Sequence, residues 1–148
     1  MKIEEIKLTD HINEMWILFS LHREELATNK ALMILKPDWD TYRNLEKLDK
    51  LLTLALYDRA LIVGYTVTLI YKNMHYSDLI DAFNDVLYLH PKYRKGSFGL
   101  RLIRKTEEEA RKRGAKRMLW HGKVDTVFSS LMPKLGYSVQ DIIFGRDL

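Results

Sequence analysis

Residues 86–100 read VLYLHPKYRKGSFGL, and this stretch decides the fold. An apolar run ends at His90, a basic turn follows, and a segment with helical periodicity begins at Phe98. The first amides of a helix lack acceptors within the helix, and the helix dipole places partial positive charge there. A strand, a basic turn and a helix start in this order therefore predict a site for an anionic phosphate group.

The helix predicted over residues 98–113 has the clearest periodicity in the chain, and Gly114 supplies its stop. Its outer face offers three acid-first i,i+4 pairs: Glu107 with Arg111, Glu108 with Lys112 and Glu109 with Arg113. Its buried face is predicted to carry Gly99, Leu102, Ile103, Thr106 and Ala110.

The rest of the chain alternates between strand and helix patterns. Thr9 or Asp10 is expected to cap the first helix, with Met15, Trp16 and Phe19 on its inner face, and Gly64 indicates a bulge or a close backbone approach. The predicted order is strand 2–7, helix from about 11, helix 39–50, hairpin 51–57 and 61–71, polar segment 72–84, strand 85–90, helix 98–113, strand 116–121, helix 124–135 and a last strand or hairpin from 137. This order predicts an α/β class, with a mixed, mostly antiparallel sheet flanked by helices.

Composition narrows the class of protein. A chain of 148 residues with 47% hydrophobic and 30% charged residues is expected to form one domain, 1–148. It contains no cysteine, no long apolar run and no basic leader, so we expect a cytoplasmic protein outside the membrane. The five histidines show no metal-ligand spacing, and no metal is predicted.

The turn resembles the cofactor motif of the GNAT acetyltransferase superfamily, Arg/Gln-x-x-Gly-x-Gly/Ala. Arg94 and Gly99 match its ends, whereas Ser97 replaces the central glycine and Gly96 stands one residue early. The segments 62–65 (IVGY) and 134–137 (KLGY) are similar to two further parts of the family pattern.

The resemblance implies a GNAT-like acyl-CoA N-acyltransferase fold and acetyl-CoA as cosubstrate. It also implies direct attack by an amine, a sheet splayed open between the fourth and fifth strands, and an acceptor site walled by the first two helices and residues 72–84. Asp125 stands where relatives often carry an asparagine near the pantetheine arm. The residues expected to bind the cosubstrate are Leu87, Leu89, Arg94, Lys95, Gly96, Ser97, Phe98, Gly99 and Asp125.

The reaction needs a base for the amine and benefits from an acid for the departing thiolate. Asp85 on the fourth strand is the best candidate for the base, and His90 and His121 could also titrate near the cleft. Met132 stands where many relatives carry a tyrosine that acts as the general acid, and the thioether of Met132 cannot donate a proton. The acid is therefore left open between Tyr88, Ser129, Ser130, Tyr137 and solvent. Pro133 is expected to kink or shorten the last helix.

Two alternatives follow from the same residues. A GNAT-fold protein could bind CoA with little or no transfer, given Ser97, Met132 and Pro133. A nucleic-acid-binding module could use the net charge of +4 through Lys92, Arg94, Lys95, Arg101, Arg104 and Lys105. The sequence does not specify the amine acceptor, a homodimer is the default assembly, and residues 88–103 and 131–148 resemble acetyltransferases of tailed phages.

Overall fold

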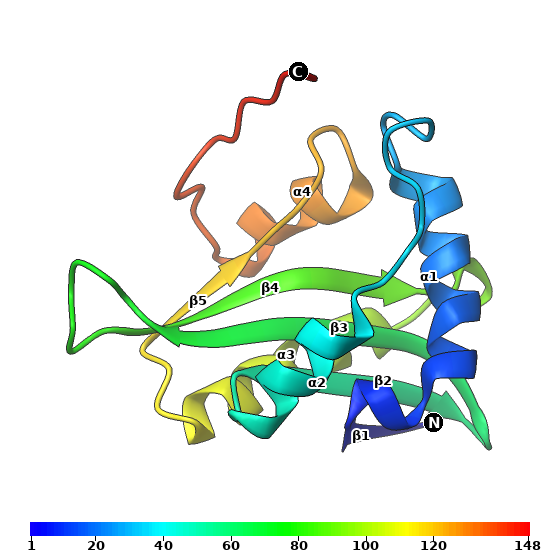
Figure 1. Cartoon of the computed structure of the whole chain (residues 1–148), viewed down its shortest axis with the longest axis horizontal. Coiled ribbons are helices and arrows are strands. Elements are labelled where there is room, and N and C mark those ends of the chain that lie inside the picture. The colour runs from blue at the N-terminus through cyan, green and yellow to red at the C-terminus, as the bar shows by residue number, and fades with distance from the viewer.

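The structure is a computed structural model that describes residues 1–148, and its centre is one five-stranded sheet (Figure 1). The strands follow the chain order from one edge to the other. They are β1 (Lys2–Ile6), β2 (Leu51–Asp58), β3 (Leu61–Lys72), β4 (Ile80–Leu89) and β5 (Arg117–Trp120). The first four pair antiparallel and β5 joins β4 in parallel, which confirms the mixed, mostly antiparallel sheet.

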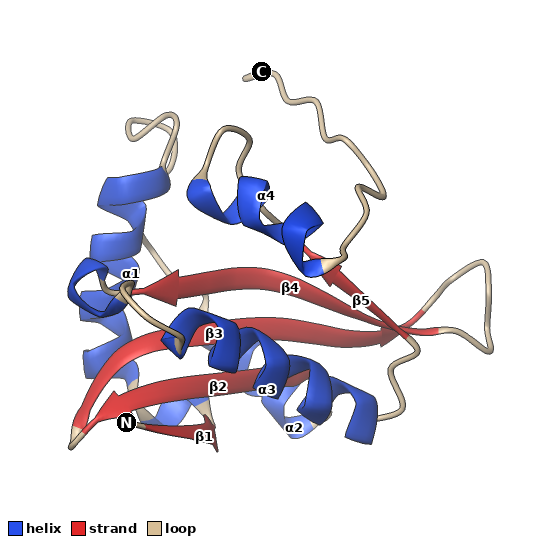
Figure 2. Ribbon diagram, turned by 180° about the vertical axis from the view of Figure 1, so that it is seen from behind, coloured by secondary structure: helices blue, strands red, loops and turns tan.

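Helices cover both faces of the sheet. Residues of α1 (Ile12–Leu26) and α2 (Trp39–Lys47) pack on one face, around a core cluster that contains Phe19, Tyr65 and Tyr88. The long helix α3 (Phe98–Lys112) covers the other face, where Leu102 and Ala110 meet Leu52 and Leu54 of β2 (Figure 2). The remaining helical elements are α4 (Val127–Leu131) and the 3₁₀ turns η1 (Leu8–Asp10), η2 (Pro91–Tyr93) and η3 (Met132–Leu135).

The start of α1 differs from the prediction. Neither Thr9 nor Asp10 caps it; both lie in η1, and His11 precedes the helix without a side-chain cap. Thr9 instead donates its amide to the Glu46 carboxylate of α2, at 3.2 Å, which ties η1 to α2. The inner face was also misassigned at Trp16, which is 44% exposed, while Leu18 takes the buried position.

The hairpin of β2 and β3 confirms the role predicted for Gly64. Gly64 is opposite Leu56 and Ile62 is opposite Tyr57, so a bulge lies at Val63, next to this glycine. A Cβ atom on Gly64 would lie 2.8 Å from Leu89 Cδ1 and 3.0 Å from the Tyr88 carbonyl oxygen. Only glycine therefore lets β3 approach the end of β4 this closely.

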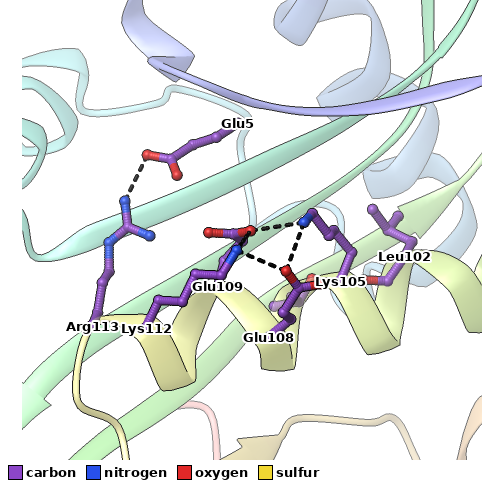
Figure 3. A network of polar contacts seen from close by, with 8 residues as sticks. Glu5, Leu102, Lys105, Glu108, Glu109, Lys112 and Arg113 are labelled. Carbon is purple, nitrogen blue, oxygen red and sulfur yellow. Dashed lines mark hydrogen bonds and ion pairs between the residues drawn. The ribbon is translucent and has the colours of Figure 1, made fainter.

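The buried face of α3 is confirmed at Leu102, Ile103, Thr106 and Ala110. On its outer face one predicted ion pair forms, Glu108 with Lys112 at 2.7 Å. The other two predicted pairs do not form: Glu109 binds Lys105 and Lys112, Arg113 binds Glu5 of β1 at 2.6 Å (Figure 3), and Glu107 faces the sheet side of the helix.

Residues 72–84 were expected to form a polar segment, but β4 already begins at Ile80. The first part of this strand was missed because it contains two buried polar side chains, Asp81 and Asn84, which are more typical of loops. The buried Asp81 carboxylate accepts hydrogen bonds from Arg117 at 2.7 and 2.9 Å and from Asn73 at 2.9 Å. The connecting loop lies at the end of the sheet away from α1, so it cannot wall the acceptor site as expected (Figure 1).

The last segment also departs from the prediction. The helix near Pro133 ends early, as expected: α4 stops at Leu131 and continues as the 3₁₀ turn η3. Residues 138–148 form neither a strand nor a hairpin; they run as an exposed coil in which Phe144 is 90% exposed. The apolar residues Val139, Ile142, Ile143 and Phe144 of this segment have no strand beside them, so their β propensity alone does not produce a strand.

Candidate active site

Strands β4 and β5 separate partway along the sheet. They pair only from Asp81 with Arg117 to Asn84 with Trp120, where β5 ends. Strand β4 continues to Leu89, still paired with β3 but with no neighbour on its other side (Figure 1). Apart from the Leu89 carbonyl oxygen, which accepts a hydrogen bond from Arg94, the backbone polar groups on that free side of β4 face the opening and are available to a ligand.

A bulge lies at the point where the two strands part. Asn84 is opposite Thr68 and Val86 is opposite Val67, so Asp85 has no partner on β3. The Asn84 amide donates to the carbonyl oxygens of Val67 at 3.1 Å and Val86 at 2.9 Å, and so holds the bulge from within. Asp85 is exposed as a result, and its carboxylate makes no hydrogen bond with the protein.

The predicted phosphate site has free donors. The six amides from Lys95 to Leu100 donate no hydrogen bond to any protein acceptor, and the first bonded amide of the helix is that of Arg101, 2.9 Å from the Ser97 carbonyl oxygen. Gly96 has φ +97°, a backbone conformation that favours glycine. The Ser97 hydroxyl does not cap the helix. This arrangement meets the geometric requirement for binding a diphosphate at a helix N-terminus.

The side chain of Arg94 was expected to bind the cosubstrate, but in the structure it binds Glu25 and the end of β4. Its two terminal nitrogens donate to the two carboxylate oxygens of Glu25 on α1, at 2.7 and 2.6 Å. Its Nε donates to the carbonyl oxygen of Leu89 at 2.7 Å, and its guanidinium lies 5.8 Å from the centre of the Tyr88 ring. The hydrogen bond from Arg94 holds the pKa of the Glu25 carboxyl below its usual value.

The other predicted cosubstrate residues lie on the α3 side of the opening or beyond it. Leu87 packs against the α3-side core, and a methyl carbon of Leu89 lies 3.8 Å from where a Cβ of Gly99 would stand. Phe98 is half-buried, with the guanidinium of Arg101 5.8 Å from its ring centre. Asp125 is exposed in the turn before α4, with φ +58°.

The two predicted histidines have different surroundings. His90 accepts a hydrogen bond from the Lys92 amide at 3.3 Å and so caps η2. His121 follows β5, where its ring lies 5.9 Å from that of Phe83. The structure brings neither of them to Asp85 by a hydrogen bond.

One residue near this site, His22 of α1, was missed. Its Nδ1 lies 3.4 Å from the Tyr65 hydroxyl, and its ring centre lies 5.2 Å from that of Tyr88. Burial lowers the pKa of His22; the charges of Glu25 and Asp85 oppose this shift, and those of Arg94 and Lys123 add to it. The signal was its helical spacing from Met15 and Leu18 on the inner face of α1.

Four side chains were considered as the acid, and three of them are committed elsewhere. Ser129 completes the cap of α4, Ser130 donates to the Val127 carbonyl oxygen at 2.9 Å, and Tyr137 donates to Glu107. Burial raises the pKa of the Tyr88 phenol, with a smaller contribution from Glu25, so this group keeps its proton at neutral pH. Of the four side chains, Tyr88 is the one whose hydroxyl makes no hydrogen bond with another protein group, and it is 4% exposed.

The structure contains neither a metal-binding cluster nor a helix suited to crossing a membrane. No group of three or more His, Asp or Glu side chains is placed to hold a metal ion. None of the helices combines the length and the apolar character that crossing a membrane requires.

Comparison with known proteins gives a family and a fold. The sequence matches the acetyltransferase (GNAT) family over residues 15–137. No curated protein matches it. The structure is similar to an aminoglycoside acetyltransferase from an uncultured soil metagenomic sample, with a TM-score of 0.78, 18% identity, and 99% of this chain and 97% of that one covered.

Two further solved structures share the fold. A ribosomal-protein-alanine N-acetyltransferase from Brucella melitensis has a TM-score of 0.74 at 13% identity, with both chains fully covered. An aminoglycoside N-acetyltransferase in complex with CoA has a TM-score of 0.72 at 14% identity, with 99% of each chain covered. The comparisons favour neither the inactive CoA binder nor the nucleic-acid module, and they do not support a phage-encoded type. Because the family match spans most of the chain and the sheet has the expected opening, the protein belongs to the acetyltransferase (GNAT) family.

Proposed function

We propose that this N-acetyltransferase transfers the acetyl group of acetyl-CoA directly to an amine that enters from the α1 side of the opening between β4 and β5. One observation carries the proposal: the free amides of residues 95–100 lie directly beyond the free half of β4. Such a pair of features can hold a diphosphate at one end and an extended arm along the strand.

The residues present fit the cosubstrate. The amides of residues 95–100 would hold the diphosphate, with Lys95 adding positive charge. Gly99 leaves room for close approach, since a Cβ at that position would have only one neighbouring atom within 4 Å. Leu87 and Leu89 would line the strand side of the pantetheine arm, and Asp125 would approach it from the α4 side.

Acetyl-CoA supplies an acyl group activated as a thioester. Asp85 is proposed to take the proton of the attacking amine, directly or through water, because its exposed carboxylate stands at the point where the strands part. As the carbon–nitrogen bond forms and the carbon–sulfur bond breaks, Tyr88 of β4 is proposed to protonate the departing sulfur. His90 and His121 remain secondary candidates for proton transfer.

The acceptor is proposed to be a small molecule or a macromolecule that presents a single amine. Carboxylates near the opening are mostly neutralised: Glu24 pairs with Arg23 and Lys30, and Glu25 pairs with Arg94. On the α1 side of the opening, Asp85 is left as the carboxylate without an ion pair, beside His22. This balance supports recognition of one positive charge more than recognition of a strongly polycationic surface.

The proposal includes a single domain over residues 1–148, a cytoplasmic location and a homodimer as the default assembly. The location is supported by the cosubstrate, because a polyanionic CoA thioester does not cross a membrane unaided.

Calorimetric titration with acetyl-CoA tests the binding half of the proposal, and release of free thiol with a panel of amines tests transfer. We expect one site per chain and turnover with at least one amine. Asp85→Asn should lower turnover by about 100-fold while it spares acetyl-CoA affinity. Asp78→Asn, in the exposed loop at the other end of the sheet, is the matched control. Unchanged turnover of the Asp85 variant would remove this residue from the mechanism.

A further inference from the structure

Glu25 and Arg94 join two parts of the molecule that lie 69 residues apart in the sequence. Glu25 belongs to the last turn of α1, the helix beside the end of β4, whereas Arg94 immediately precedes the free amides of residues 95–100. The two side chains meet in a bidentate pair at 2.7 and 2.6 Å. A third bond, from Arg94 Nε to the Leu89 carbonyl oxygen at 2.7 Å, anchors the same guanidinium to the last residue of β4.

These hydrogen bonds fix the position of the Arg94 guanidinium, but they add little to the stability of the whole fold. The Arg94 and Glu25 side chains are 42% and 36% exposed, and exposed ion pairs contribute little to global stability. A planar guanidinium that donates two hydrogen bonds to the Glu25 carboxylate and one to the Leu89 carbonyl oxygen nevertheless has one orientation only. Its position over the Tyr88 ring restricts it further.

The segment beyond Arg94 has few other constraints. Residues 95–97 make no side-chain hydrogen bond, and Gly96 among them has a positive φ. The preceding turn is held through Tyr93, whose hydroxyl donates to Asp58 at 2.8 Å. The last anchor before the free amides is therefore Arg94, and a ligand that needs those amides in one arrangement binds more weakly if they must first be ordered.

We propose that Glu25 is a positioning residue for acetyl-CoA: acting through Arg94, it holds the amides of residues 95–100 in their binding arrangement and fixes α1 against them. In this role the Arg94 side chain serves as a brace and not as a phosphate ligand. The inference rests on the proposed placement of the diphosphate at these amides. It also implies that the helix on the acceptor side and the cosubstrate turn move together.

A double-mutant cycle tests the proposal, with acetyl-CoA as the probe. Glu25→Gln keeps the shape of the side chain and removes its charge, and Glu24→Gln is the matched control because Glu24 pairs with Arg23 and Lys30 instead. We expect Glu25→Gln to weaken acetyl-CoA binding about tenfold, which corresponds to about 1.4 kcal/mol. Its melting temperature should stay close to that of the unmodified chain, and the control should bind normally.

The Arg94 variants and the double variant test whether Glu25 affects binding through Arg94. If Glu25 acts through Arg94, the double variant with Arg94→Gln should bind no more weakly than Arg94→Gln alone. Arg94→Lys should not restore binding, because an ammonium group cannot make the bidentate pair. In steady-state assays the loss should fall mainly on the KM for acetyl-CoA.

Three results would overturn the proposal. Unchanged binding by Glu25→Gln would mean that Glu25 does not position the amides, and tighter binding would mean that Arg94 must leave Glu25 to contact the ligand. Fully additive losses in the double variant would mean that Glu25 does not act through Arg94. A lack of binding by the unmodified chain would instead remove the proposed function itself, and the positioning role with it.

Discussion

Gly64→Ala should disturb the end of β4 and the cosubstrate turn together. The new Cβ would lie 2.8 Å from Leu89 Cδ1, 3.0 Å from the Tyr88 carbonyl oxygen and 3.4 Å from the Leu89 Cα. A flexible methyl group can move away from the first contact, but the second and third are with backbone. Strand β4 must therefore shift away from β3 by several tenths of an ångström.

The magnitude follows from the two opposing effects of the added methyl group. Forcing a methyl group into a packed site costs typically about 1–3 kcal/mol. Replacing glycine stabilises by about 0.4–1 kcal/mol through the unfolded chain, and this offset applies here because Gly64 has no positive φ. We expect a net loss of about 1–2 kcal/mol in the free energy of unfolding. For a chain of this size such a loss lowers the melting temperature by roughly 3–8 °C.

The shift should also weaken acetyl-CoA binding, because the carbonyl oxygen of Leu89 accepts the Arg94 bond that precedes the free amides. Urea denaturation and calorimetric titration measure the two effects, and Gly145→Ala is the control, since nothing lies within 4 Å of a Cβ at that position. If Gly64→Ala matched the unmodified chain in both stability and acetyl-CoA affinity, the reasoning about this close approach would be refuted.

Three further predictions concern single side chains. Gly99→Val should abolish acetyl-CoA binding in calorimetry yet leave the melting temperature nearly unchanged, because a Cβ there meets only Leu89 Cδ2, at 3.8 Å; retained affinity would show that the diphosphate binds elsewhere. Asp81→Asn should lower the free energy of unfolding at pH 7, measured by urea denaturation, by about 2 kcal/mol. Because the Arg117 hydrogen bonds lower the pKa of Asp81, the stabilisation by its carboxylate is present above about pH 4 and is lost as the pH falls through the folded pKa. His22→Gln should lose less stability between pH 7 and pH 5 than the unmodified chain, because burial lowers the pKa of His22 and its neutral form stabilises the fold only at higher pH; identical pH profiles would contradict this.

The parts of the fold that the sequence predicted well are those in which periodicity and burial agree. The hairpin of β2 and β3 and the buried face of α3 consist of apolar residues at the spacing of their element. The turn before α3 was predictable because Pro91 and Gly96 interrupt the pattern between an apolar strand and a periodic helix. Gly64 was predictable because glycine inside a strand weakens it unless a close contact requires it.

Side-chain partners across the sheet could not be read from the sequence. Asp81 and Asn84 look like loop residues, yet both are buried in β4. Arg117 and Asn73 donate to the Asp81 carboxylate, and the Asn84 amide nitrogen donates to the Val67 carbonyl oxygen. Arg94 was assigned to the cosubstrate by its charge and by its match to the family motif, whereas its side chain pairs with Glu25 on α1. The two predicted histidines were those at the ends of predicted strands, so His22, which reaches the site only through packing of α1, was not chosen.

These unpredicted contacts set the shape of the opening. Pairing between β4 and β5 ends at Asn84, so no backbone hydrogen bonds fix the separation of the two segments beyond it. Instead, a carboxylate on each side of the opening holds the neighbouring segments through hydrogen bonds. Glu25 holds the end of β4 and the cosubstrate turn through Arg94. On the other side Glu107 of α3 accepts hydrogen bonds from Trp120 at the end of β5, at 3.1 Å, and from the Tyr137 hydroxyl. Because both carboxylates are polar and partly exposed, their loss should change the width of the opening, and hence substrate affinity, more than it changes the stability of the sheet.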